Sequence, residues 1–198
     1  VLGFPYPTLD FPFFVPLGES YDLTLSPGLR TDWQAPRAGT RFRYHPRPGL
    51  RGFLSAVWTH DDRVETTSAL TNRLAMRATH HQRHGNLQWH TELSWVSDDL
   101  YQRDFSVSLQ DQVARYLPSR TRLVWQNPFA IIELHADFLT YLSNGNAADP
   151  STYSNHSSNE LGLPQRSPAL QLSLLPLPLG GGWSLAGLFS SARFGPWS

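Results

Sequence analysis

The chain has 198 residues, of which 40% are hydrophobic and only 16% charged, and its formal net charge is zero. That length suffices for one domain with a core, and the balanced charge gives no electrostatic basis for nucleic-acid binding. No run of about 18 apolar residues is present, which excludes a helical membrane span but not a transmembrane β-barrel, whose strands alternate. The absence of cysteine excludes disulfides and thiolate metal sites.

Every basic residue other than histidine is an arginine. A GC-rich genome explains this bias, and the alternative is recognition of planar anions such as phosphate. The first residues, Val1–Pro7, carry no charged region followed by an apolar one, so no signal peptide is visible. Because both ends of the chain look strand-like, we expect a piece of a longer protein.

Strand-like runs separated by turn-rich segments make up most of the chain, and helical periodicity is nearly absent. The predicted strands are Phe11–Leu17, Tyr21–Trp33, Thr40–His45, Leu50–Thr59, Leu74–His81, Asn86–Val96, Thr121–Gln126, Ala130–Leu142, Leu170–Leu179 and Trp183–Phe194. Polar loops are predicted at Thr59–Ala69, Ser97–Asp111 and Ser143–Asn159, and Gln110–Tyr116 is the only helical candidate. The pattern predicts an all-β, antiparallel fold of about nine or ten strands.

Asn86–Val96 shows most clearly that the strands have two different faces. Leu87, Trp89, Leu93 and Trp95 alternate with polar residues, and successive side chains of a strand point to opposite sides. The polar residues assigned to the second face of this and other strands are Arg41, Arg43, Gln88, His90, Glu92, Glu133, His135 and Asp137. The apolar face meets either a protein core, as in a β-sandwich, or lipid, as in an outer-membrane barrel.

Two features favour the barrel. Short turns alternate with long polar loops, which is typical of outer-membrane barrels. Aromatic residues lie towards strand ends, where they suit the girdles at membrane interfaces. These residues are Tyr44, Trp58, Trp89, Trp95, Trp125, Tyr141 and Trp183.

Other candidate sites are weaker. His80, His81 and His84 straddle a strand and its turn, whereas zinc ligands four residues apart converge on a helix. His60–Asp62 and Asp98–Asp99 lack the spacing of a known calcium loop and are interpreted as loop carboxylates. No Gly-x-Ser-x-Gly elbow is present, and Gly180–Gly182 is a hairpin turn. The sequence predicts no metal and no cofactor.

Three segments carry a resemblance to a known family. They are Tyr21–Pro27 with Phe42–Tyr44 and Asp61–Arg63, then Val96–Phe105, then Leu163–Arg166 leading into an alternating strand. In this order and spacing the chain resembles the barrel domain of the LptD family of outer-membrane lipopolysaccharide-assembly proteins. The resemblance implies that residues 1–198 are the N-terminal portion of a barrel of about two dozen strands, without the family's periplasmic jellyroll and C-terminal strands.

The same resemblance implies transport in the outer membrane of a Gram-negative cell. Lipopolysaccharide arrives from the periplasmic Lpt bridge, the lipoprotein LptE plugs the barrel, and the lipid leaves sideways through a seam into the surrounding membrane lipids. Pro16 and Pro27 match prolines beside that seam, although the interval between them is shorter here than in the family. Proline lacks an N–H, so each removes a ladder hydrogen bond and weakens this lateral gate. The polar face would then line the lumen.

Two other function classes stay open at this point. One is a soluble all-β module whose aromatic residues stack on carbohydrate, and the other is a hydrolase in a small outer-membrane barrel. Solubility in plain buffer would favour the former, and lipase activity that depends on a serine and a histidine would favour the latter.

Overall fold

A computed structural model describes residues 8–30, 36–61, 71–98, 101–105, 110, 114, 116–142, 165–181, 183–192 and 194–195. Its strands are β1 (Thr8–Asp10), β2 (Phe13–Pro16), β3 (Tyr21–Arg30), β4 (Pro36–Arg47), β5 (Leu50–His60), β6 (Asn72–His84), β7 (Leu87–Val96), β8 (Tyr116–Gln126), β9 (Ala130–Tyr141), β10 (Gln165–Gly180), β11 (Trp183–Ser191) and β12 (Phe194–Gly195). One short helix, α1 (Tyr101–Phe105), is also described.

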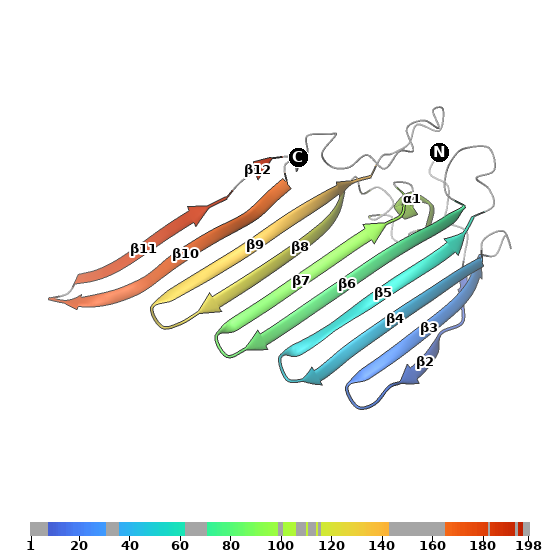
Figure 1. The fold of residues 1–198 in the computed structure, drawn as a ribbon, viewed down its shortest axis with the longest axis horizontal. Coiled ribbons are helices and arrows are strands. Elements are labelled where there is room, and N and C mark those ends of the chain that lie inside the picture. The colour runs from blue at the N-terminus through green and yellow to red at the C-terminus, as the bar shows by residue number, and fades with distance from the viewer. Residues whose placement is uncertain are drawn as a thin grey trace.

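All of these strands form a single antiparallel sheet in which chain neighbours pair (Figure 1). The order runs from β1 through β3, β4 and so on to β11, while β2 also pairs with β3 and β12 with β10. Nine strands, β3 to β11, have nine or more residues, and the other three are short. The predicted all-β antiparallel fold is therefore confirmed, as an open sheet whose first and last strands do not pair with each other.

The connections at the two ends of the sheet differ in length. Tight turns join β4 to β5, β6 to β7, β8 to β9 and β10 to β11 along one edge of Figure 1, and the strand ends that are separated by longer stretches of sequence lie at the opposite edge. Gly85 sits in the two-residue turn between β6 and β7 with a φ of 54°, a left-handed conformation that glycine adopts without steric cost. This matches the turn predicted at His84–Gly85.

The two faces follow directly from the strand register. On one side, Leu23, Phe42, Leu54, Ala78 and Leu93 pair in a continuous row from β3 to β7. We call this side the apolar face. On the other side, the polar face, a row runs from β3 to β9 through Asp22, Arg43, Phe53, Thr79, Glu92, Arg120 and Asp137.

Several strands are longer than predicted. The segment predicted as Thr40–His45 extends to Pro36–Arg47, and Leu74–His81 extends to Asn72–His84. The register of β3 continues unbroken through Pro27 to Leu29. Cross-strand pairing extends these strands through residues whose own sequence pattern is weak.

The helix predicted at Gln110–Tyr116 is wrong at its C-terminal end. Helix α1 lies inside the segment predicted as the polar loop Ser97–Asp111, whereas Tyr116, the last residue of the predicted helix, begins β8. Gln110 is helical, and most of the remaining predicted helix and the whole predicted loop Ser143–Asn159 lie outside the described residues. No described helix is long and apolar enough to cross a membrane.

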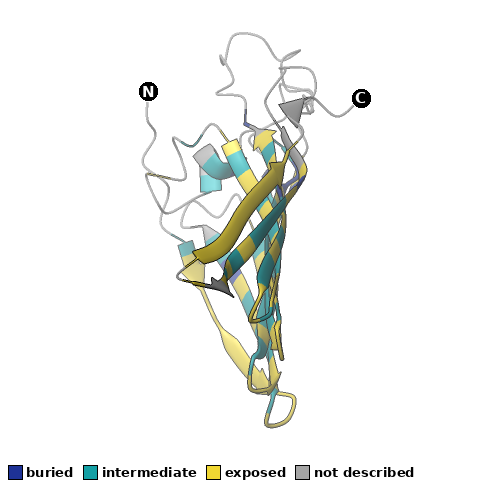
Figure 2. Ribbon diagram, turned by 90° about the vertical axis from the view of Figure 1, so that its left-hand side faces the viewer, coloured by how far each residue is buried: buried dark blue, intermediate teal, exposed yellow. Residues whose placement is uncertain are grey.

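Little of the described chain is buried. The sheet is one layer thick when seen edge-on, and exposed and partly buried residues alternate along its strands (Figure 2). Among the described residues, one cluster of buried apolar side chains, Val96, Tyr101 and Leu142, lies at the end of the sheet opposite the tight turns, with Ala75, Phe105 and Leu117 packed around it. Large side chains of the apolar face, among them Leu54 (46% exposed) and Leu93 (48% exposed), remain open to the surroundings.

Candidate functional site

The structure brings all eight predicted polar residues to the same face of the sheet. Arg41 and Arg43 lie on β4, Gln88, His90 and Glu92 on β7, and Glu133, His135 and Asp137 on β9. Neighbouring rows of the polar face join His90 to His135 through Arg122, and Glu92 to Asp137 through Arg120. That this face lines a lumen stays a prediction.

Three carboxylates of the polar face are paired with arginines. Arg43 Nε lies 2.8 Å from Asp22 Oδ1, and Arg122 donates two hydrogen bonds to Glu133, of 2.9 and 2.8 Å. Arg120 lies 3.7 Å from Glu92, which also lies 3.3 Å from His90 Nε2. These arginine side chains are more than half exposed, so each pair contributes at most about 1 kcal/mol to stability.

The two predicted gate prolines lie in the first two strand positions of the sheet, Pro16 at the end of β2 and Pro27 within β3. The N–H of Leu17 bonds to Tyr21 and that of Phe11 bonds to the carbonyl of Pro27, both at 2.9 Å. In an antiparallel pair, alternate residues direct both backbone groups at the same neighbour. The odd-numbered residues therefore bond to β3, and the even-numbered Pro16 faces the free edge of the sheet.

Pro27 weakens a different line of the sheet. Its carbonyl points at Phe11, so the donor that proline lacks is missing on that side, between the first and second strands. The gap coincides with the break between β1 and β2 at residues 11–12. Pro16 thus removes a backbone N–H donor from the free edge of the sheet. Pro27 removes one from the next line of hydrogen bonds, between residue 11 and β3.

Aromatic residues form a belt on the apolar face near the tight turns. Ring centroids are 6.1 Å apart for Tyr21 and Phe42, 6.2 Å for Phe42 and Tyr44, 6.0 Å for Tyr44 and His80, and 4.5 Å for His80 and Trp89. Tyr44 Oη and His80 Nδ1 are hydrogen-bonded at 2.6 Å. The belt contains Tyr44 and Trp89 from the predicted girdle, whereas the side chain of Tyr141 lies outside the described residues.

His80 had been considered as a metal ligand with His81 and His84. His80 faces the apolar side and His81 pairs with His90 on the polar side, since adjacent strand residues point in opposite directions. Among the described residues, no group of three or more possible ligands is arranged to hold a metal ion.

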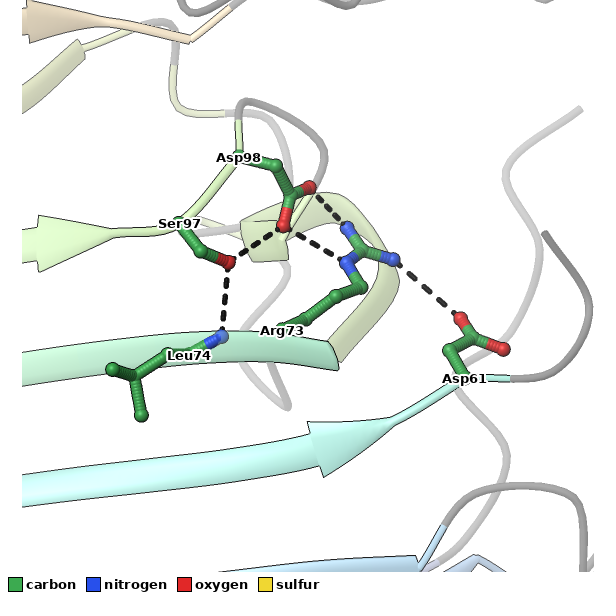
Figure 3. A network of polar contacts seen from close by, with 5 residues as sticks. All are labelled: Asp61, Arg73, Leu74, Ser97 and Asp98. Atoms are coloured by element: carbon green, nitrogen blue, oxygen red, sulfur yellow. Dashed lines mark hydrogen bonds and ion pairs between the residues drawn. The ribbon is translucent and has the colours of Figure 1, made fainter. Parts of the chain in front are cut away.

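A buried polar cluster around Arg73 was not predicted from the sequence (Figure 3). Arg73 on β6 donates two hydrogen bonds to Asp98, at 2.9 and 2.5 Å, and lies 3.5 Å from Asp61. The guanidinium also lies over the rings of Phe105 and Tyr101, 4.7 and 5.9 Å from their centroids. Asp61 and Asp98 lie just beyond the ends of β5 and β7, as their interpretation as loop carboxylates expects, and both are directed at the buried guanidinium of Arg73.

This arrangement, which we call the Arg73 cap, holds α1 against the sheet. The side chains of Arg73 and Asp61 are only 4% and 2% exposed. Ser97 Oγ bonds to Asp98 and accepts from the backbone N–H of Leu74, which fixes the turn that leads into α1. Burial raises the pKa of the Tyr101 hydroxyl, against smaller opposing effects of Arg37 and Arg73.

A hollow of 820 Å³ opens at the turn end of β2 to β7. Its lining includes Pro16, Arg43, Arg51, His81 and His90. The hollow therefore adjoins both the free edge and the charged rows of the polar face.

These features define an open all-β antiparallel sheet with one apolar and one polar face, consistent with a part of a barrel wall. No family model matches the chain. The chain is similar to the LPS-assembly protein LptD of Bordetella pertussis, with 32% identity over 125 residues, which covers 61% of this chain and 15% of that protein. It is also similar to LptD of Acidovorax sp., with 28% identity over 189 residues, covering 92% of this chain and 21% of that protein.

The chain thus spans about a fifth or less of the length of these relatives. The similarity to the Acidovorax protein extends over nearly all of the chain. Both of these relatives are LPS-assembly proteins.

Proposed function

We propose that the chain forms the N-terminal part of an outer-membrane barrel that inserts lipopolysaccharide into the outer leaflet. The apolar face contacts membrane lipid and the polar face lines the lumen. The protein acts in transport and assembly, not as an enzyme. The observation that carries the proposal is the register, which gathers charged residues on one side and exposed apolar side chains on the other.

The exposure of the apolar face supports contact with lipid. Leu54, Met76, Leu93 and Trp95 lie in adjoining rows and are each more than a third exposed. Soluble monomers rarely expose contiguous apolar patches larger than a few hundred Å². In the described ranges every strand belongs to the same sheet, so no second sheet covers this face as a β-sandwich requires.

Strand length fits the same proposal. β4 to β9 contain 10 to 13 residues each, against the 9–11 residues needed to cross a bilayer as tilted strands. The aromatic belt at their turn ends suits the membrane interface, where amphipathic rings are favoured.

The exit route is proposed at the first edge of the sheet. Pro16 removes a donor from the free edge, and Pro27 removes one from the ladder behind it. In hydrocarbon an unpaired backbone group costs several kcal/mol, so a seam that lacks donors is easier to part than a complete ladder. Lipopolysaccharide would leave through this gate while its sugars stay on the polar side.

The partners belong to the same proposal. Lipopolysaccharide is the cargo, LptE plugs the lumen, and the periplasmic Lpt bridge delivers through a domain that precedes this region. The further strands that close the barrel would pair with β11, whose described residues are all exposed.

Depletion of the intact protein in its source bacterium tests the proposed function. Newly made lipopolysaccharide should stop reaching the cell surface, as measured by pulse labelling and surface modification, while total synthesis continues at first. Surface delivery that is unchanged after depletion would contradict the proposal. A protein that stays monodisperse in buffer without detergent would instead favour the carbohydrate-binding alternative.

A further inference from the structure

The charges of the polar face are distributed unevenly between strands. β4, β5 and β6 together contain eight arginines and no aspartate or glutamate. The carboxylates of the face lie on the flanking strands β3, β7 and β9, as Asp22, Glu92, Glu133 and Asp137. Three neighbouring strands in the middle of the polar face are thus uniformly cationic.

Most of these arginines are not neutralised. Arg43 pairs with Asp22, and Arg73 pairs with Asp61 and Asp98. In the part of the chain that the structure describes, five others on this face form no ion pair with a carboxylate. These five, which we call the arginine track, are Arg37, Arg41, Arg51, Arg77 and Arg83.

The arginine track runs along the full height of the sheet. In the strand register, Arg37 lies opposite Thr59, near the end of the sheet away from the tight turns. Arg41 and Arg77 lie in one row, on either side of Ser55, at mid-height. Arg51 lies opposite His81, near the tight turns. Arg83 lies two residues beyond His81. At about 3.4 Å per residue, the track spans roughly 34 Å in steps within reach of successive anionic groups.

The guanidinium groups of the arginine track favour an anionic ligand. A guanidinium binds phosphate and carboxylate through two parallel N–H donors, and Arg41, Arg51, Arg77 and Arg83 are exposed on the polar face. A neutral sugar accepts hydrogen bonds from guanidinium groups but gains no charge attraction, and a cation is repelled. The extended length favours a chain-like anion over a single small ion.

We propose that the arginine track binds the phosphorylated or carboxylated sugar chain of the transported glycolipid. This inference rests on the proposed function for the identity of the cargo. The track holds the anionic sugars by paired hydrogen bonds and guides them from the turn end towards the long-loop end. The paired arginines Arg120 and Arg122, two strands away, do not contribute, because Glu92 and Glu133 already satisfy them.

Fluorescence anisotropy on the intact protein in detergent tests the track. The probe is a fluorescein-labelled oligosaccharide that carries two phosphomonoesters, compared with the same oligosaccharide after phosphatase treatment. Wild-type protein should prefer the phosphorylated probe, and the double variant Arg41→Gln with Arg77→Gln should bind it about tenfold or more weakly. Both side chains are exposed, so this variant folds normally.

Two matched variants separate the possible causes. Arg122→Gln with Glu133→Gln removes a neutral pair from the same face and should leave affinity unchanged. Arg41→Lys with Arg77→Lys keeps the charge but loses the planar fork, and should show an intermediate affinity. Equal binding of both probes by the wild type, or equal affinity in wild type and the Gln double variant, would overturn the track.

Failure of the arginine track can be distinguished from failure of the proposed function. If depletion leaves lipopolysaccharide delivery intact but the probe still binds through Arg41 and Arg77, the track stands and the proposed transport role fails. If delivery depends on the protein but the Gln double variant binds like wild type, the transport role stands and the track fails.

Discussion

At the scale of single residues, Arg73 is a buried arginine whose two ion pairs stabilise the docking of α1. Its charge is almost fully buried, and two carboxylates and two aromatic rings surround it. Breaking a buried ion pair by removing one partner costs about 3–5 kcal/mol, because the remaining charges stay buried without compensation. Arg73 therefore decides whether α1 stays docked.

Arg73→Met should release the cap while the sheet remains folded. We expect a nitroxide label at Gln102→Cys on α1 to be immobile in the otherwise wild-type protein and mobile in the variant, by electron paramagnetic resonance. The control is Arg122→Met, which breaks an exposed pair worth at most about 1 kcal/mol and should leave the label immobile. An immobile label in the Arg73 variant would show that packing alone holds α1.

Tyr101 makes the same cap sensitive to alkaline pH. Burial raises the pKa of its hydroxyl above the ordinary value of 10.0, so the docked state favours the neutral phenol. The stability this provides is complete below pH 10 and is lost as pH rises through the raised pKa, because the undocked chain ionises first. The label at Gln102→Cys should therefore become mobile above pH 10, and Tyr101→Phe should abolish that change. The same pH profile in both proteins would contradict a role for Tyr101.

At the scale of elements, the period-two pattern of the strands was enough to predict the two faces. Leu93 and Glu92 were assigned to opposite sides from sequence alone, and the register separates them in that way. The strand ends were less predictable, since pairing with a neighbour decides how far a strand continues. Short helix α1 could not be predicted because its position depends on Arg73, 25 residues away from Asp98 in the chain.

Gly52 should be essential for the aromatic belt. It pairs with both Tyr44 and His80, and a Cβ at this position would meet the Tyr44 ring and the carbonyl of Thr79. Gly52→Ala should therefore displace Tyr44, break its hydrogen bond to His80 and lower the unfolding midpoint in detergent. Gly39→Ala is the matched control, because a Cβ there would meet Ser26 at 3.4 Å, an ordinary contact. Equal midpoints for the two variants would contradict this account.

The prolines of the first edge should control lipid exit. Pro16→Ala with Pro27→Ala restores one donor at the free edge, where a strand that closes the proposed barrel would accept it, and one between residue 11 and β3. Each hydrogen bond formed in this way is worth about 1 kcal/mol. We expect slower appearance of new lipopolysaccharide at the surface of cells that carry the double variant. The control is Pro118→Ala in β8, far from the edge. An unchanged rate of lipopolysaccharide appearance at the surface in the double variant would contradict the proposed gate.

At the scale of the whole molecule, the described strands form an open sheet one layer thick. Its backbone is unpaired at both edges, and its apolar face has almost no core behind it. Both are satisfied if further strands close the sheet and lipid covers the apolar face. That the chain is part of a larger barrel, as its resemblance to the LptD family implies, stays a prediction, and the exposed apolar rows are consistent with it.

Which face meets lipid is the central claim, and adjacent residues at mid-height of β5 test it most directly. Leu54 lies on the apolar face and Ser55 on the polar face. Nitroxide labels at Leu54→Cys and Ser55→Cys, in the intact protein in lipid vesicles, should differ in collisional accessibility by electron paramagnetic resonance. The label at position 54 should be reached by oxygen, which concentrates in hydrocarbon, and the label at position 55 by a water-soluble nickel chelate. Equal access of the nickel chelate to both positions, or the reverse order, would contradict a lipid-facing apolar surface.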